Sequence, residues 1–166
     1  MRLRLSQHEF GRRRKGFFER IKTKGLEGAC LFGPTAVFYL TGFPFLATER
    51  PIAVAITPED RVVLFVPRLE GEHAKEEVPE AEVRTYPEYP GEKHPLEQFK
   101  DMLAEIGLLD KDLAADADGY SSGQGYRGPK LSSLVSGKVT LVGEMVEEMR
   151  MVKSAEEIEL IRESAR

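Results

Sequence analysis

The chain has 166 residues, of which 41% are hydrophobic and 31% are charged, and its formal net charge is -4 at pH 7. This balance is typical of a globular protein and excludes a disordered chain, and the lack of a basic excess argues against a nucleic-acid-binding protein. The single cysteine, Cys30, excludes a disulfide framework and favours a reducing compartment. Because it lies in the apolar stretch ACLF, it is expected to be a small buried side chain.

The N-terminal segment lacks the apolar core of a secretory signal, and no run approaches the about 18 apolar residues of a membrane span. We therefore expect a cytoplasmic protein with no membrane partner. Ser6 and Glu9 form a capping-box pattern that begins a helix, which is expected to run to about Lys24 and to end near Gly25. Its basic run, residues 12–15, is interpreted as a solvated helix face rather than a nucleic-acid patch.

Short apolar strands and helices alternate through the next part of the chain. GACLFG predicts a buried strand, AVFYL a short helix ending at Gly42, and RPIAVAITPEDRVVLFVPRLE a hairpin that turns at residues 57–60. A helix over residues 69–78, an edge strand over 82–89 and an amphipathic helix over 94–108 are expected to follow.

A strand, a short helix and a further strand are expected at residues 112–118, 129–137 and 139–144. The sequence thus predicts one α/β domain over residues 1–150, with a three-layer arrangement in which helices flank a mixed sheet of about six strands.

The C-terminal stretch begins another helix, for which Ser154 and Glu157 have the capping-box spacing. The sequence stops at Arg166 within this helix, without a terminating glycine. We therefore expect residues 151–166 to be a linker and the first helix of a further domain, which would cover the apolar face of the helix.

Two motifs could carry chemistry without a partner domain. GYSSGQG, residues 119–125, follows a predicted strand, and Glu144 ends the next one, which is close to a dinucleotide-binding arrangement. A flexible surface loop is favoured because residues 127–129 separate the glycines from the next helix, so a stand-alone nucleotide-binding module is kept as the alternative function. His73 lies near Glu70 on one helix face, where a solvated charged face is favoured over a metal site.

Glu49 and Arg50 stand directly before the apolar run IAVAI and admit two interpretations. An exposed ion pair at the edge of a strand would contribute little to stability. Alternatively, Arg50 faces a ligand or a partner subunit, since a guanidinium binds a carboxylate through two parallel hydrogen bonds.

Two stretches resemble a known family. YLTGF followed by TERP resembles the early segment of the creatinase/prolidase N-terminal domain, and EMRMVKSAEEIELIRESAR resembles the junction with its metallopeptidase domain. The resemblance covers essentially the whole chain and implies a parent protein such as an Xaa-Pro dipeptidase, an Xaa-Pro aminopeptidase or creatinase. In that family, two divalent metal ions (Mn, Co or Zn) are held by carboxylates and a histidine of the second domain.

None of those metal-ligand positions falls within residues 1–166, so the resemblance implies no catalytic and no metal-binding residue here, and the chain alone is expected to be non-catalytic. Its expected partners are its own C-terminal catalytic domain, a second copy in a homodimer, and a peptide substrate. By similarity, the loop after YLTGF reaches the active site of the neighbouring subunit. Its expected substrate-binding residues are Arg50, Glu49, Thr48 and Phe45.

Overall fold

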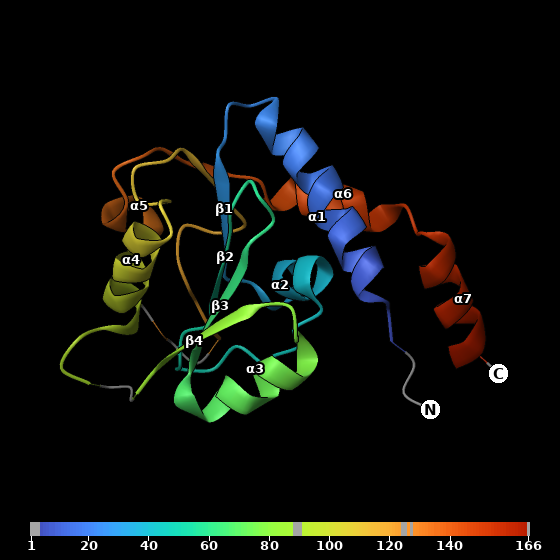
Figure 1. Cartoon of the computed structure of the whole chain (residues 1–166), viewed down its shortest axis with the longest axis horizontal. Helices are drawn as coiled ribbons and strands as arrows, with labels where there is room; N and C mark the ends of the chain where they lie inside the picture. Colours follow the sequence, from blue (N-terminus) through green and yellow to red (C-terminus); the bar gives the residue numbers. More distant parts are fainter. Residues whose placement is uncertain (1–3, 88–90, 124–125, 127, 166) are drawn as a thin grey trace.

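The computed structural model describes residues 4–87, 91–123, 126 and 128–165. The described chain forms three layers, with a six-stranded sheet between two sets of helices (Figure 1). The strands are β1 (Gly28–Leu31), β2 (Ala53–Ile56), β3 (Val62–Pro67), β4 (Glu82–Tyr86), β5 (Leu113–Ala115) and β6 (Val139–Leu141). The helices are α1 (Gln7–Lys22), α2 (Pro34–Thr41), η1 (Arg68–Glu70), α3 (Gly71–Glu77), α4 (Pro95–Glu105), α5 (Leu131–Leu134), α6 (Gly143–Met151) and α7 (Ala155–Ser164).

The strand order is β4-β3-β2-β1-β5-β6, and the sheet is mixed as expected. β2 runs antiparallel to both of its neighbours, β1 and β3, whereas β4 pairs with β3, and β5 with β1 and β6, in parallel. β2 therefore begins at the edge of the sheet where all the other strands end. The segment that leads into β2 therefore lies at the same end of the sheet as the segments that leave its neighbours, β1 and β3, and the next strands, β4 and β5.

Alternate residues of the central strands fill two separate cores. On β1, Leu31 faces the core beneath α1, α2, α3 and α6, whereas Cys30 faces the core beneath α4 and α5. β2 and β3 alternate in the same way, with Val54 in the first core and Phe65 in the second. β1, β2, β3 and β5 are buried on both faces, which explains their nearly continuous apolar sequences. No helix of the described residues is long and apolar enough to span a membrane.

Helix α1 begins at its predicted cap but does not form the predicted capping box. Ser6 Oγ accepts from the Glu9 N–H at 3.2 Å, as the pattern indicates. The Glu9 carboxylate turns away from Ser6 and accepts hydrogen bonds from Arg12 at 2.8 Å and from Arg13 at 3.1 Å. The Ser6 N–H instead donates to Glu156 of α7. Hydrogen bonding to Arg12, followed by contributions from Ser154 and Arg13, lowers the pKa of Glu9 to about 2.

The expectation of a solvated basic face on α1 is wrong for two of its four residues. Arg12 and Lys15 are exposed, but Arg13 and Arg14 are only 2% and 5% exposed. Their guanidinium groups donate to two backbone carbonyls at the end of α2, Arg13 to Tyr39 at 3.0 Å and Arg14 to Leu40 at 3.2 Å. The last carbonyls of a helix lack partners within the helix and carry its negative dipole end, so they favour cations.

Each buried arginine also binds a carboxylate from a distant segment. Arg14 forms a two-pronged ion pair with Asp60, at 2.6 and 3.1 Å. Asp60 lies in the turn between β2 and β3 with a φ of 64°, which is a left-handed conformation that aspartate tolerates better than most residues. Because Arg14 also contacts α2, one guanidinium holds α1, α2 and the hairpin turn together.

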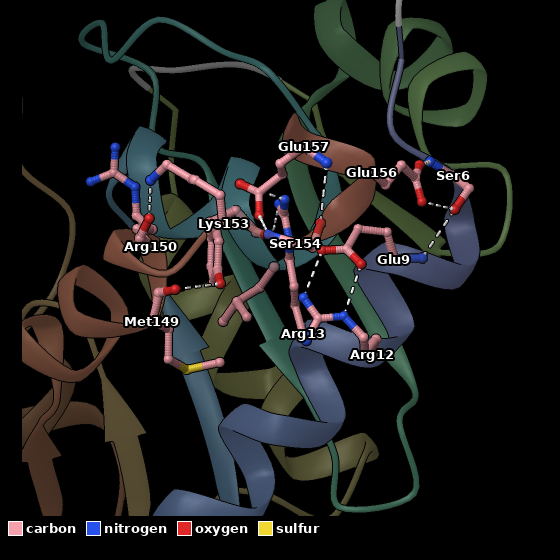
Figure 2. Close-up of polar contacts among 12 residues, drawn as sticks. Ser6, Glu9, Arg12, Arg13, Met149, Arg150, Lys153, Ser154, Glu156 and Glu157 are labelled. Atoms are coloured by element: carbon pink, nitrogen blue, oxygen red, sulfur yellow. Dashed lines mark hydrogen bonds and ion pairs between the residues drawn. The ribbon is translucent and has the colours of Figure 1, made fainter. Parts of the chain in front are cut away.

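Arg13 forms the corresponding connection to α7 (Figure 2). Its Nη2 lies 3.1 Å from Glu157 Oε1, while the other oxygen of Glu157 accepts from the Ser154 N–H at 2.9 Å. The predicted capping box of α7 is thus confirmed, and its acidic residue also binds a buried cation. None of the ten residues of α7 is buried, and Ile158 and Ile161 are 40% and 54% exposed. The described attachment of α7 to α1 is therefore polar.

The contact between Arg14 and the hairpin turn predicts a measurable loss of stability in Asp60→Ala. We expect the free energy of unfolding to fall by about 2–4 kcal/mol, because a buried guanidinium loses its carboxylate and alanine is strained at a positive φ. Urea denaturation followed by circular dichroism measures this change. Asp60→Asn, which tolerates the same backbone conformation, should lose less. Wild-type stability of Asp60→Ala would contradict the inferred role of the ion pair.

The polar attachment of α7 predicts a local effect of Glu157→Ala. Without this carboxylate, α7 loses both its capping box and its contact with Arg13, so its amides should exchange about tenfold faster or more. Hydrogen exchange resolved by residue measures this, and the amides of β1 and β2 should be unchanged. Glu159→Ala is the matched control, because Glu159 is exposed and pairs with Arg162 within α7. Equal exchange in both variants would show that α7 is held by other contacts.

Candidate functional site

The loop over residues 43–51, which we call the Arg50 loop, joins α2 to β2. Gly42 ends α2 with a φ of 81°, and a Cβ atom at this position would lie 2.7 Å from the Phe10 ring. Glycine is therefore required both by the backbone conformation and by the close approach of α1. In the YLTGF stretch, Leu40 and Phe43 are fully buried, so this motif anchors the start of the loop in the core.

Three of the four predicted substrate-binding residues line one surface groove of about 530 Å³, namely Phe45, Thr48 and Arg50. The groove is also lined by Leu69, Glu70 and His73 from the segment that follows β3, together with Pro44, Leu46, Ile52 and Pro67. It thus lies at the edge of the sheet where β3 ends and β2 begins. Glu49, the fourth predicted residue, is not among the lining residues.

Arg50 forms an ion pair with Glu49, and the two side chains are 38% and 47% exposed. An ion pair this accessible to water contributes little to stability. The Arg50 N–H donates to Thr48 Oγ at 3.2 Å, which bends the loop locally. Arg50 therefore presents a cation to the groove. The carboxylate of Glu49 already accepts a hydrogen bond from the guanidinium of Arg50, whose other N–H groups can donate to a ligand.

His73 lies in the same groove as Arg50, which the sequence did not indicate. Its Nδ1 lies 2.8 Å from Glu70 Oε2, and its ring is 5.2 Å from the ring of Phe43. The two polar side chains are partly exposed, in keeping with the predicted charged helix face. Their spacing predicted a mutual contact, but their position in the same groove as Arg50 depends on the pairing of β2 with β3. Glu77, another carboxylate of α3, is buried and binds Arg4.

The glycine-rich stretch at residues 119–125 does not form a dinucleotide-binding arrangement in its described part. Residues 124, 125 and 127 lie outside the described residues. At the end of β5, the partly buried carboxylate of Asp116 accepts from the N–H groups of Phe32 and Gly33, at 2.8 and 2.7 Å. The carboxylate thus occupies the two amides that follow β1, and burial raises the pKa of Asp116. The following helix, α5, has four residues, and Glu144 lies in α6 rather than at the end of a strand.

Other candidate groups in the described residues offer no catalytic centre. No cluster of three or more histidine, cysteine, aspartate or glutamate residues is arranged to hold a metal ion there. Cys30 is fully buried, as expected, and desolvation raises the pKa of its thiol, so it is not a nucleophile at neutral pH. The site consists of a groove that can bind a charged ligand.

The family model of the creatinase/prolidase N-terminal domain matches residues 13–152. A proline dipeptidase from Streptococcus pneumoniae superposes with a TM-score of 0.66 at 23% identity, covering 84% of this chain and 97% of that one. The creatinase/prolidase N-terminal domain of an X-Pro dipeptidase from Streptococcus pyogenes gives 0.66 at 23% identity, covering 87% and 100%. No curated protein matches the chain.

A longer structure shares the same fold. The dipeptidase PepE from Mycobacterium ulcerans superposes with a TM-score of 0.71 at 20% identity, covering 94% of this chain and 40% of that one. This chain therefore spans about two fifths of that protein. At these identities, the superpositions establish a shared fold.

The exposure of the Glu49–Arg50 pair predicts that Arg50→Ala folds almost normally. We expect its free energy of unfolding to differ from wild type by no more than about 0.5 kcal/mol, because both charges of the pair remain accessible to water. Urea denaturation measures the difference. Arg14→Ala, which removes a buried arginine, provides a destabilised control. A loss for Arg50→Ala as large as that control would assign Arg50 a structural role.

Proposed function

The chain belongs to the creatinase/prolidase N-terminal domain family, and on this basis we propose that it is the non-catalytic N-terminal domain of a cytoplasmic Xaa-Pro dipeptidase or Xaa-Pro aminopeptidase. The observation that carries the proposal is the family match over residues 13–152, supported by the fold shared with solved dipeptidases. The domain helps a homodimer to form and contributes the Arg50 loop to the substrate site of the neighbouring subunit.

The chemistry of the groove supports substrate binding as its role. The Arg50 guanidinium stays charged at any working pH and can bind the free carboxylate of a short peptide through two parallel hydrogen bonds. Phe45 and Leu46 offer an apolar wall beside it, on which a proline ring can pack. A substrate carboxylate would replace Glu49 as the partner of Arg50, so a cation that is paired in the free domain becomes a binding group in the dimer.

Hydrolysis itself belongs to the second domain in this proposal. Two divalent metal ions, Mn, Co or Zn, would there supply an activated water for attack on the peptide bond. The described residues of this chain contain no cluster that fits such an ion, so their part is to bind and orient the substrate. The peptide substrate, the catalytic domain and a second copy of the chain are the proposed partners.

Replacing Arg50 tests this role in the enzyme that joins this domain to its catalytic domain. For Arg50→Ala, we expect kcat/KM on an Xaa-Pro dipeptide with a free carboxylate to fall about ten- to a hundredfold, the value of one charge-assisted contact. The same dipeptide with an amidated C-terminus should be cleaved equally by wild type and variant.

The matched control is Arg61→Ala, which removes an exposed arginine that pairs with Glu82 on the sheet. This variant should cleave both substrates as wild type does. An Arg50→Ala enzyme that is impaired equally on both substrates, or on neither, would refute carboxylate binding by Arg50.

A further inference from the structure

We propose that Tyr120 is a positioning residue for Arg50, and that Tyr86 assists it by holding the loop on the other side of Arg50 in the sequence. This inference rests on the proposed function, in which Arg50 binds the substrate carboxylate. The two tyrosines do not belong to the loop or to the residues that line its groove. Their hydroxyl groups act on the backbone of the Arg50 loop and thereby determine where the guanidinium lies.

The hydrogen bonds of the two hydroxyl groups bracket Arg50 in the sequence. Tyr120 Oη donates to the carbonyl oxygen of Thr48 at 2.8 Å, and Tyr86 Oη donates to the carbonyl oxygen of Pro51 at 2.8 Å. Between these two points, the Arg50 N–H donates to Thr48 Oγ. The backbone is thus held two residues before Arg50, at Arg50 itself and one residue after it.

The two tyrosines lie on the same face of the sheet and reach the loop from strands on either side of β2. Tyr86 is the last residue of β4, two strands from β2 in one direction, and Tyr120 follows β5, two strands from β2 in the other. Both are almost completely buried. The Tyr86 ring stacks on Phe65 with centroids 5.2 Å apart, and the Tyr120 ring lies 5.0 Å from that of Tyr126. Each hydroxyl is therefore presented by a ring that packing already immobilises.

This arrangement lowers the conformational entropy that an exposed arginine would lose when it binds a ligand. A long side chain on a mobile loop loses conformational entropy when it binds a ligand, and a loop fixed beforehand loses less. Arg50 is more than one third exposed, so packing around its own side chain does not hold it. The rigidity must come from the backbone, and the tyrosine hydroxyl groups supply hydrogen bonds to that backbone.

The experiment compares Tyr120→Phe with Tyr39→Phe. Both changes remove one hydroxyl and keep the ring, so the fold should persist. Tyr39 is the matched control because it is also buried and donates to a backbone carbonyl, that of Met149 at 3.1 Å, which lies in α6 and outside the Arg50 loop. The first measurement is amide hydrogen exchange of the 166-residue chain. In Tyr120→Phe, the Arg50 amide should exchange about fivefold faster, the value of one hydrogen bond, and in Tyr39→Phe it should not change.

The second measurement is activity in the enzyme with its catalytic domain, with free and amidated Xaa-Pro dipeptides as substrates. Tyr120→Phe should raise KM about fivefold for the free dipeptide, leave kcat nearly unchanged, and not affect the amidated one. In the Arg50→Ala background, the same change should have no further effect on either substrate. A purely structural role of the hydroxyl would lower both activities alike.

The outcomes separate this inference from the proposed function. Unchanged exchange of the Arg50 amide in Tyr120→Phe would overturn the positioning role, and so would a faster exchange without a change in KM while Arg50→Ala is selectively impaired. If Arg50→Ala itself shows no selective loss, the proposed role of Arg50 is wrong. Positioning by Tyr120 then fails with it, although the exchange measurement would still show the hydrogen bond to the loop.

Discussion

The rest of the structure depends on how the charges of two adjacent buried arginines in α1 are balanced by carboxylates and backbone carbonyls. A buried cation is costly unless it is paired and fully hydrogen-bonded. Arg13 and Arg14 meet this requirement by binding the last carbonyls of α2 and nearby carboxylates, those of Glu9 and Glu157 for Arg13 and that of Asp60 for Arg14. Arg13 also lies over the Tyr39 ring, 4.3 Å from its centroid. These contacts determine where α2 ends relative to α1, the hairpin turn and α7.

The position of the candidate site follows from the end of α2. Gly42 turns the chain out of the helix, and Phe43 anchors it in the core, so the Arg50 loop starts from a fixed point. The loop ends where β2 enters the middle of the sheet, at the end of the sheet where the other strands finish. Ligand sites of α/β proteins commonly lie at the carboxyl ends of strands, because loops from several strands converge there. In this domain, the guanidinium of Arg50 thereby shares a groove with Glu70 and His73, which belong to a later segment of the chain.

The domain has a fold that it shares with several solved dipeptidases, and its candidate site is open to solvent. The superposed dipeptidases share 20–23% of their residues with this chain and keep the same fold. Such a fold is maintained by the pattern of buried apolar positions, which tolerates substitution as long as volume and alternation persist. Function must therefore be sought in specific side chains. The groove around Arg50 has charge and an apolar wall, and the described residues contain no cluster arranged to hold a metal ion.

The sequence by itself determined the features that depend on near neighbours in the chain. Apolar alternation located β2 and β3, glycine marked the end of α2 at Gly42, and the spacing of Ser154 and Glu157 predicted the capping box of α7, because these patterns act over about four residues. Only the tertiary structure decided the burial of Arg13 and Arg14, the turn of Glu9 away from Ser6, and the place of His73 in the groove of Arg50. The partners of these side chains come from other elements, such as the Tyr39 carbonyl 26 residues from Arg13. Whether a charged side chain is solvated or buried depends on which groups the fold brings to it, and local sequence carries no information on that.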